Sequence, residues 1–492
     1  MAQKTKIHMI TKPLGEFTYK CKPYDHQQRE FERSRDMEYY GLFWEMGTGK
    51  SKPIADTAAH LFLECEIDGV LIISDKGAYL NWYFEEIPKH FMDGIPYRMA
   101  YWSAYMRKDE KYRANQLLEA QDDMLDILCM NVEALSSEKA YHFASQFLQS
   151  HYSLMVIDES TSIKNPKADR TRACFKLGAL ANYRRVMTGT PITQSPLDLF
   201  AQCQFLKPGV LGYTSYTAFR ASYAVIMTIS LGSRSFPKIM GYQHLDRLTE
   251  SIQPFTSRIL KSECLDLPDK VYETIFVEQT PEQERMYVQL KEMSLLQLEQ
   301  GLLTSTSALT TINKLHQINC GHVKLDDETL VDIPNNRVSQ MCRLLNEVVG
   351  KKIIWCCFQH DVELILAELD KDEYEGYAVH YYGKTTDNDR LAAISQFHKD
   401  PKCQWFVGTA ATGGKAITLV ESHTTAYYSN SYNLEDRLQS EDRNHRIGQT
   451  NKVTYLDFVC SGTVDVRILR ALREKKDLAH QVLDSFREML TP

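Results

Sequence analysis

The stretch Phe43-Trp-Glu-Met-Gly-Thr-Gly-Lys-Ser51 decides how the rest of the chain is organised. Gly47 and Gly49 permit the backbone bends that bring several N–H groups onto phosphate oxygens. In such a loop, Lys50 reaches the β- and γ-phosphates and the Ser51 hydroxyl binds Mg²⁺. The pattern therefore predicts a phosphate-binding loop for a nucleoside triphosphate.

The residues around this loop mostly support the prediction. Residues 51–63 favour a helix, with Pro53 in the first turn, where proline is tolerated. The N-terminus of a helix is itself an anion site. Thr48, between the two glycines, belongs to the same predicted nucleotide contact. Trp44 stands where such loops usually carry their first glycine, so an ordinary turn is the alternative.

Length and composition indicate a globular protein with two or three domains. The chain has 492 residues, 43% hydrophobic and 25% charged. Its 12 cysteines include no Cys-x-x-Cys pair, which argues against a zinc ribbon and for a reducing compartment. No stretch has the character of a signal peptide or a membrane span. We therefore expect a soluble cytoplasmic protein without a membrane partner.

The net charge of −7 does not by itself indicate a nucleic-acid-binding protein. Net charge governs solubility and non-specific association, and it does not describe the lining of one groove. A local basic track for DNA therefore remains open.

Short apolar runs rich in β-branched residues recur along the chain, and most do not alternate with polar residues. They cover residues 70–74, 127–130, 154–157, 185–187, 353–358, 405–407 and 453–459. Such runs are typical of strands buried on both faces. Helix-compatible segments lie between many of them, for example at 80–90, 140–149 and 362–369. The pattern predicts an α/β fold with two blocks of parallel sheet, at about 20–205 and 335–480.

The stretch between the blocks is predicted to be mainly helical. Thr280-Pro281-Glu282-Gln283 supplies a cap, a first-turn proline and the glutamine of a capping box. We place the first domain at 1–255, with a helical protrusion at about 205–255. The second domain is placed at 256–492, with a helical insert at about 280–320 and a core at about 335–480.

Two carboxylates follow the predicted strand at 154–157. Ligands of α/β sheets bind at the carboxyl ends of strands, where Asp158 can hold Mg²⁺ and Glu159 can orient an attacking water. A charged turn after a strand is the alternative. The next strand ends in Met187-Thr-Gly-Thr-Pro191, whose hydroxyls can contact the acidic pair, although a plain turn explains these residues equally well.

Three further stretches carry polar side chains that could contact a nucleotide or a nucleic acid. Gln27 can pair with the N6 and N7 edge of adenine. Thr409-Ala-Ala-Thr-Gly-Gly-Lys415 can approach phosphates of a nucleotide or of a nucleic acid. Arg443 and Arg446 would share a face on a helix, and an arginine from a second lobe stabilises the transition state of phosphoryl transfer. The alternatives are a solvated helix start, a flexible loop and a salt-bridged surface helix.

In this order, the motifs resemble the helicase-like ATPases of superfamily two, and within them the Swi/Snf family of DNA translocases. The likeness runs from about residue 20 to residue 475 and is most specific in Glu441–Gln449. The other matching stretches are Leu154–Glu159 with Ile163–Asn165, Met187–Pro191 with Asp198–Phe200, Leu71–Ile73 with Asn81-Trp82, and Leu267–Lys270.

The resemblance implies two RecA-like lobes with ATP between them and DNA across their tops. It also assigns roles: Gln27 to adenine, Lys50 and Ser51 to phosphate and Mg²⁺, Asp158 to Mg²⁺, Glu159 to water, and Gln439, Arg443 and Arg446 to closure on the nucleotide. The implied activity is ATP hydrolysis, stimulated by DNA, that drives movement along double-stranded DNA, usually without strand separation. The absence of further recognisable domains suggests a minimal motor of bacterial or phage type.

The predicted DNA-facing residues are Lys76, Asn81, Trp82, Thr409 and Gly413. Single-stranded and branched DNA stay open as partners. One alternative is a helicase that separates DNA or RNA strands. The other is an ATP-gated DNA-binding protein that recruits a partner and hydrolyses weakly. Departures from the family pattern motivate that second alternative, at Ser160, Thr161, Ala416 and Thr418.

Overall fold

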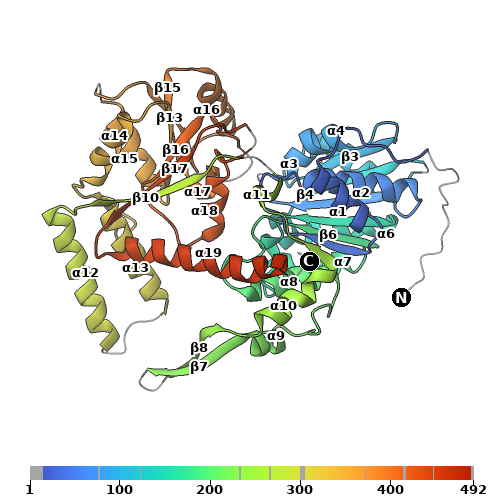
Figure 1. Cartoon of the computed structure of the whole chain (residues 1–492), viewed down its shortest axis with the longest axis horizontal. Coiled ribbons are helices and arrows are strands. Elements are labelled where there is room, and N and C mark those ends of the chain that lie inside the picture. Colours follow the sequence, from blue (N-terminus) through green and yellow to red (C-terminus); the bar gives the residue numbers. More distant parts are fainter. Residues whose placement is uncertain are drawn as a thin grey trace. The chain divides into compact units, whose positions relative to one another are not determined.

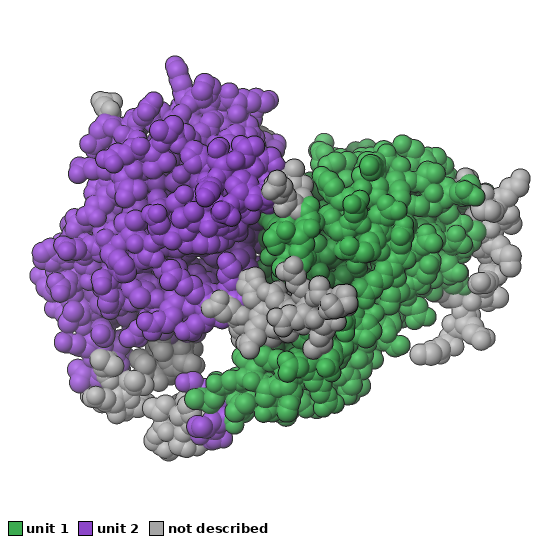
Figure 2. Space-filling model, in the orientation of Figure 1, with its two compact units in different colours: residues 1–226, 239–265, 478–492 green, residues 227–238, 266–477 purple. Residues whose placement is uncertain are grey.

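The computed structural model describes residues 15–488, except 76–77, 122, 232–233, 265–266, 300–304, 372, 414–416 and 447. The chain divides into two compact units, coloured separately in Figure 2. Unit 1 comprises residues 1–226, 239–265 and 478–492, and unit 2 comprises residues 227–238 and 266–477. Each unit contains one large parallel sheet with helices packed against it (Figure 1), which confirms the predicted fold class.

The sheet of unit 1 has seven strands in the order β3-β4-β2-β5-β6-β1-β9, and neighbouring strands run parallel. The strands are β1 (Tyr39–Leu42), β2 (Gly69–Ser74), β3 (Tyr97–Trp102), β4 (Leu125–Asn131), β5 (Ser153–Asp158), β6 (Tyr183–Met187) and β9 (Thr256–Ser257). Strands β5, β6 and β1 are consecutive neighbours, so the segments that follow them emerge side by side.

Helices cover this sheet on both faces. They are α1 (Asp25–Ser34), α2 (Ser51–Leu63), α3 (Tyr79–Asn81), α4 (Ile87–His90), α5 (Lys108–Gln116), α6 (Glu138–Ser150), α7 (Asp169–Gly178), α8 (Leu199–Leu206) and α11 (Lys261–Cys264). Strand β2 shows why its apolar run does not alternate. Leu71 and Ile73 belong to one core and Val70 and Ile72 to the other, because successive side chains point to opposite faces.

The predicted helical protrusion at about 205–255 is only partly helical. It contains α9 (Tyr216–Tyr223) and α10 (Leu245–Ile252), but β7 (Ala224–Leu231) and β8 (Arg234–Tyr242) form a two-stranded sheet between them. The helical prediction is therefore wrong for residues 224–231 and 234–242. β-branched residues in the first run, and a Gly-Ser pair between the two runs, favour strands over helix.

The main sheet of unit 2 has six parallel strands in the order β10-β17-β16-β13-β15-β14. The strands are β10 (Lys270–Val277), β13 (Lys351–Cys356), β14 (Tyr377–Tyr381), β15 (Cys403–Thr409), β16 (Ser422–Tyr427) and β17 (Val453–Cys460). A small antiparallel pair, β11 (His322–Lys324) with β12 (Leu330–Asp332), lies apart from this sheet.

The helical insert of unit 2 is present as predicted. It consists of α12 (Pro281–Glu299) and α13 (Ser305–Asn319), and the predicted capping box is confirmed. The Gln283 N–H donates to Thr280 Oγ1 at 3.2 Å, and the Thr280 N–H donates to Gln283 Oε1 at 3.0 Å. The other helices are α14 (Arg337–Asn346), α15 (Gln359–Leu369), α16 (Asp387–Lys399), α17 (Ala410–Gly413), α18 (Leu434–Glu441) and α19 (Val464–Glu488), which begins in unit 2. Within the described part of the chain, no helix has both the length and the apolarity to cross a membrane.

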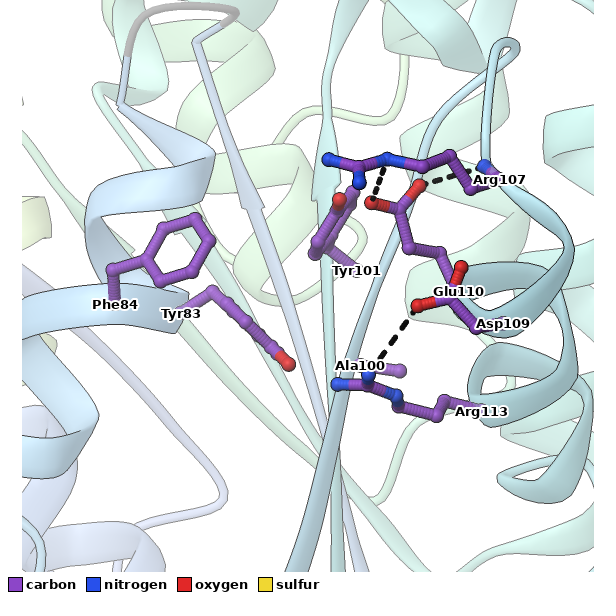
Figure 3. A pocket seen from close by; sticks show the side chains of 8 residues that line it. All are labelled: Tyr83, Phe84, Ala100, Tyr101, Arg107, Asp109, Glu110 and Arg113. Carbon is purple, nitrogen blue, oxygen red and sulfur yellow. Dashed lines mark hydrogen bonds and ion pairs between the residues drawn. The ribbon is translucent and has the colours of Figure 1, made fainter.

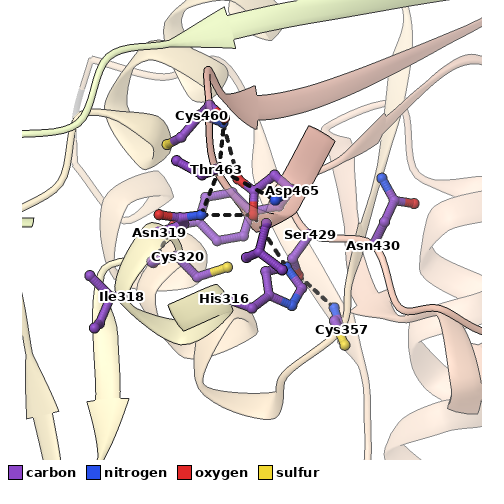
Figure 4. Close-up of polar contacts among 12 residues, drawn as sticks. His316, Ile318, Asn319, Cys320, Cys357, Ser429, Asn430, Cys460, Thr463 and Asp465 are labelled. Atoms are coloured by element: carbon purple, nitrogen blue, oxygen red, sulfur yellow. Dashed lines mark hydrogen bonds and ion pairs between the residues drawn. The ribbon is translucent and has the colours of Figure 1, made fainter. Parts of the chain in front are cut away.

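A buried polar network ties the insert to the core of unit 2 (Figure 4). Asn319 Nδ2 donates to Thr463 Oγ1 at 2.9 Å and to Asp465 Oδ1 at 3.0 Å. Arg337 forms an ion pair with the same carboxylate, and both side chains are buried. Burial alone would raise the pKa of Asp465, but the charges of Arg337 and His316 and the hydrogen bonds from Asn319 and the Cys460 N–H together outweigh it, and the pKa lies below its ordinary value. Asp465 therefore holds α13, α14 and α19 together as a charged group.

We predict that Asp465→Ala lowers the free energy of unfolding by about 3–5 kcal/mol, because it leaves the Arg337 guanidinium buried without a carboxylate. Urea unfolding at pH 7, followed by circular dichroism, measures this. The control is Asp109→Ala, which breaks an exposed pair with Arg113 and should cost at most about 1 kcal/mol. Because the folded pKa of Asp465 is lowered, its contribution is present at neutral pH and is lost as the pH falls below about 4. Equal costs for the two variants would contradict the prediction.

Candidate nucleotide-binding site

The predicted phosphate loop connects β1 to α2 in unit 1. Gly47 and Gly49 have φ angles of +77° and +80°, in the left-handed region that glycine adopts without penalty. Helix α2 begins at Ser51, directly after Lys50, as the sequence predicts. The backbone therefore has the bends and the helix N-terminus that a phosphate loop requires.

Helix α1 braces the loop through two adjacent side chains. Gln27 Nε2 donates to the Gly49 carbonyl at 2.9 Å, and His26 Nε2 lies 2.9 Å from the Thr48 carbonyl oxygen. Gln27 Oε1 accepts from the Tyr24 N–H at 2.8 Å, and the side chain is buried. Gln27 thus lies at the loop as predicted, and reading adenine would require it to exchange these backbone partners.

Lys50 is buried and points back into its own loop. Its ammonium donates to the carbonyl oxygens of Trp44 at 3.1 Å and Glu45 at 3.2 Å. Burial lowers the pKa of Lys50, whereas the nearby carboxylates of Glu159 and Asp158 act in the opposite direction. The ammonium therefore lies within electrostatic reach of both predicted catalytic carboxylates and is held by two acceptors that phosphate oxygens can replace.

Asp158 ends β5, and three neighbouring groups of unit 1 donate hydrogen bonds to its carboxylate. Trp82 Nε1 donates to Oδ2 at 2.8 Å, Ser74 Oγ donates to Oδ2 at 3.1 Å, and the Glu159 N–H donates to Oδ1 at 3.0 Å. Burial raises the pKa of Asp158, and the hydrogen bond from Trp82 and the charge of Lys50 oppose that rise. These donors fix the orientation of the carboxylate.

The backbone of Glu159 has a φ angle of +49°, which is uncommon for residues other than glycine, asparagine and aspartate. Thr188 Oγ1 donates to Glu159 Oε2 at 2.9 Å. This confirms the predicted contact between the hydroxyls after β6 and the acidic pair. A Cβ built on Gly189 would lie 2.6 Å from Met46 Cγ, so the same segment also packs closely against the phosphate loop.

Ser160, one of the residues that depart from the family pattern, forms a buried hydrogen bond. Ser160 Oγ donates to Gln202 Oε1 at 2.7 Å, and Gln202 Nε2 donates to the Pro191 carbonyl at 2.7 Å. Both side chains are buried. Ser160 therefore connects the end of β5 to the segment that carries Thr188. Among the other departures, Thr161 is buried and Ala416 lies outside the described residues.

The predicted arginines of unit 2 do not lie on a helix, because α18 ends at Glu441. Arg443 and Arg446 nevertheless share an acceptor, the Ile417 carbonyl, at 2.9 and 3.4 Å. Arg446 also donates to Thr418 Oγ1 at 2.9 Å. Gln439, on α18, is buried and its amide donates to Glu435 at 3.3 Å. Arg443 and Arg446 thus reach the Ile417 carbonyl from the turns that follow α18, and not from one face of a helix.

The predicted DNA-facing residues do not all reach the surface. Asn81 is exposed. Trp82 is only 1% exposed and lies in the core with its indole on Asp158, so it offers no surface to DNA. Thr409 and Gly413 are buried at the end of β15 and in α17, and Lys76 lies outside the described residues.

Beside this region is a pocket of about 230 Å³ that the sequence did not indicate (Figure 3). Its lining combines aromatic rings with charged side chains: Tyr83, Phe84, Ala100, Tyr101, Arg107, Asp109, Glu110 and Arg113. Each arginine forms an ion pair with one of the two carboxylates. The charges of the pocket are therefore balanced, unlike the basic track that phosphate binding requires.

No group of three or more histidine, cysteine, aspartate or glutamate side chains within the described ranges could hold a metal ion. A cation at this loop would therefore depend on hydroxyl, water and phosphate oxygens besides the carboxylate of Asp158.

Three features together define a phosphate-loop protein with RecA-like lobes. They are the parallel sheets of both units, the glycine-bearing loop that leads into α2, and the acidic pair after β5. Comparison with known families gives the particular group. The family described as SNF2-related domain matches residues 20–324, and the helicase conserved C-terminal domain matches residues 336–448. The chain belongs to the SNF2-related family, as the motifs predicted.

Individual relatives are distant. The TATA-binding protein-associated factor MOT1 of Saccharomyces cerevisiae is 24% identical and covers 68% of this chain. An uncharacterized ATP-dependent helicase of Mycoplasma pneumoniae is 24% identical and covers 89%. The chain spans only 21% and 40% of the lengths of these relatives. A solved structure, the Sulfolobus solfataricus SWI2/SNF2 ATPase core in complex with dsDNA, is 23% identical with a TM-score of 0.42, covering 96% of this chain and 95% of that one.

We predict that Gly49→Ala is more destabilising than Gly94→Ala. Both glycines have positive φ angles, so both variants incur a backbone cost of about 1–2 kcal/mol. At Gly94 a new Cβ meets nothing within 4 Å, whereas at Gly49 it would lie 2.3 Å from Gln27 Nε2. Loss of the Gln27 hydrogen bond should add about 1 kcal/mol. Urea unfolding of the two variants compares them, and equal costs would show that Gln27 does not brace the loop.

Proposed function

We propose that this chain is a DNA-stimulated ATPase that uses hydrolysis to move along double-stranded DNA. The observation that carries the proposal is the convergence of Lys50, Asp158 and Glu159 beyond the carboxyl ends of β1 and β5, the two strands that flank β6, where the pKa of Lys50 responds to both carboxylates. Phosphoryl transfer requires a cation on the phosphates, a carboxylate for the metal and a group that orients water. Membership of the SNF2-related family supports ATP as the nucleotide.

The residues at the loop fit a magnesium nucleotide. The hydroxyl of Ser51 and the carboxylate of Asp158 are oxygen ligands of the kind that Mg²⁺ prefers. When bound, Mg²⁺ neutralises charge on the β- and γ-phosphate oxygens. The N–H groups of residues 47–50 would hold the phosphates, and Lys50 would exchange the carbonyls of its loop for phosphate oxygens.

The other side chains of the predicted site have proposed roles of their own. Glu159 would orient the attacking water with one carboxylate oxygen, while Thr188 holds the other. Gln27 would contact adenine after releasing its backbone partners. Arg443 and Arg446 carry permanent charges that can stabilise the transition state. Gln439 would close on the nucleotide with them.

Double-stranded DNA is the proposed partner. The proposal is supported by family membership and by the names of relatives, which include the DNA excision repair protein CSB of Oryza sativa. Binding would depend on phosphate contacts and would weaken as salt is added. Of the predicted DNA-facing residues we retain Asn81, which is exposed, and Lys76, which lies outside the described residues. We leave out Trp82, Thr409 and Gly413, because all three are buried.

Steady-state ATP hydrolysis with duplex DNA, single-stranded DNA and RNA, at two salt concentrations, tests this proposal. We expect stimulation mainly by duplex DNA, increasing with duplex length and decreasing with salt. Stronger stimulation by single strands would favour the strand-separating helicase, which the names of the Mycoplasma relatives also suggest. ATP-dependent DNA binding without turnover would favour the recruitment protein.

We predict that Thr188→Val lowers kcat by about tenfold or more, because a hydrogen bond to a charged group contributes about 1.5–3 kcal/mol. Thr190→Val is the matched control, two residues away. Thr190 is also buried, but its hydroxyl has no hydrogen-bond partner among the residues that the structure describes. The measurement is kcat at saturating ATP. Equal losses in the two variants would mean that the hydroxyl of Thr188 does not position Glu159.

A further inference from the structure

Strand β3 forms one edge of the sheet of unit 1. Among the described residues, β4 is the one strand paired with it. Directly before β3, the Pro96 carbonyl accepts from the Leu125 N–H at 3.0 Å, so the backbone of residue 96 faces β4. Backbone groups alternate in direction along a strand, and those of Tyr97, Met99 and Tyr101 therefore point away from β4. An extended segment of about five residues can pair with this edge.

The pocket of Figure 3 lies across this edge. On one face of β3, Tyr101 packs against the same core as Tyr83, which belongs to the π-helical turn η1 (Trp82–Glu86). On the other face, Ala100 shares a core with Ala114 of α5. Residues of β3, of η1 and of the first turns of α5 all line the pocket. A strand added to β3 would therefore have η1 on one side and α5 on the other.

The η1 side of the pocket offers aromatic surface. The ring of Tyr83 lies 4.8 Å from that of Phe84 and 5.1 Å from that of Tyr101, centroid to centroid, and both pairs are nearly perpendicular. Phe84 is 60% exposed. Exposed aromatic side chains are the commonest anchors of protein interfaces, because they bury a large apolar area on binding. This side of the pocket therefore fits apolar side chains.

The α5 side of the pocket is positively charged. Residues 107–113 contain four cations and two carboxylates, a net charge of +2. The side chains of Arg107 and Arg113 are 84% and 57% exposed, and they form ion pairs with Glu110 and Asp109 at 3.4 Å. Such surface pairs contribute little free energy, so their guanidinium groups can pair with a further carboxylate. This side of the pocket therefore fits acidic side chains.

We propose that the open edge of β3 binds an extended segment of a partner protein in which apolar and acidic side chains alternate. Successive side chains of an added strand point to opposite faces of the sheet. The apolar ones would contact the rings of Tyr83 and Phe84, and the acidic ones would pair with Arg107 and Arg113. The inference goes beyond the proposed ATPase function and does not depend on it.

The first test uses a fluorescein-labelled heptapeptide with glutamate at the odd positions, valine at the second and sixth, and phenylalanine at the fourth. Its binding to the full chain is measured by fluorescence anisotropy. The control peptide has the same composition with its glutamates in one block. We expect the alternating peptide to bind at least about tenfold more tightly, because only alternation matches the two sides of the pocket. Absent or equal binding of the two peptides would overturn the proposal.

The second test concerns the backbone and leaves the protein unchanged. One form of the alternating peptide is N-methylated at its glutamates and another at its apolar residues. A strand that pairs with β3 uses the N–H groups of one set only. We expect one form to bind about tenfold or more weakly, since several hydrogen bonds are lost, and the other to bind like the parent peptide. Equal binding of the two forms would contradict strand addition.

The third test locates the peptide. Phe84→Ala should weaken binding by about fivefold or more, as truncation of an interface anchor does. Phe276→Ala is the matched control, because Phe276 is 61% exposed and lies on β10, the edge strand of the other sheet. Arg107→Ala should also weaken binding and reduce its dependence on salt. Thermal unfolding verifies that each variant is folded.

The remaining outcomes identify other occupants. Equal weakening by Phe84→Ala and Phe276→Ala would place the peptide elsewhere. Binding of labelled oligothymidylate that Phe84→Ala abolishes, without binding of the peptide, would make the surface a nucleic-acid site. Dimers in sedimentation equilibrium that Phe84→Ala dissociates would make the occupant a second copy of the chain. Each of these results overturns the proposal, and none of them bears on ATP hydrolysis.

Discussion

The buried ammonium of Lys50 beside Asp158 and Glu159 is the interaction on which the site depends. Burial disfavours the charged form of the lysine, and the two carboxylates together with the Trp44 and Glu45 carbonyls favour it. A polyphosphate that enters this loop adds several negative charges next to Asp158 and Glu159. A divalent cation that entered with the phosphate would reduce that repulsion, so the charge balance at Lys50 agrees with the proposal of a magnesium nucleotide.

The parallel sheet supplies the geometry that this charge balance needs. Strands β5, β6 and β1 are neighbours, so the acidic pair, Thr188 and the phosphate loop begin side by side although they are far apart in sequence. Gly189 allows its segment to approach Met46 closely, and Thr188 holds Glu159. The segment that follows β6 therefore contacts both Glu159 and the phosphate loop.

Local features of the site were predictable from sequence, as was the contact of Thr188 with Glu159, because both follow neighbouring strands. Other features that depend on long-range packing were not. The glycines of the loop, the start of α2 at Ser51 and the capping box at Thr280 each lie within a few residues, so spacing alone indicates them. Trp82 was predicted to face DNA because the stretch Asn81-Trp82 resembles a motif of the family, and only the fold reveals that its indole donates to Asp158, 76 positions away.

A crystal structure of the protein with Mg²⁺ and a non-hydrolysable ATP analogue is the most direct test of the central claim. The account predicts that Lys50 Nζ leaves the carbonyls of Trp44 and Glu45 and contacts phosphate oxygens, with the cation beside Ser51 and Asp158. An analogue bound elsewhere, with Lys50 still donating to the carbonyls of its own loop, would contradict the account.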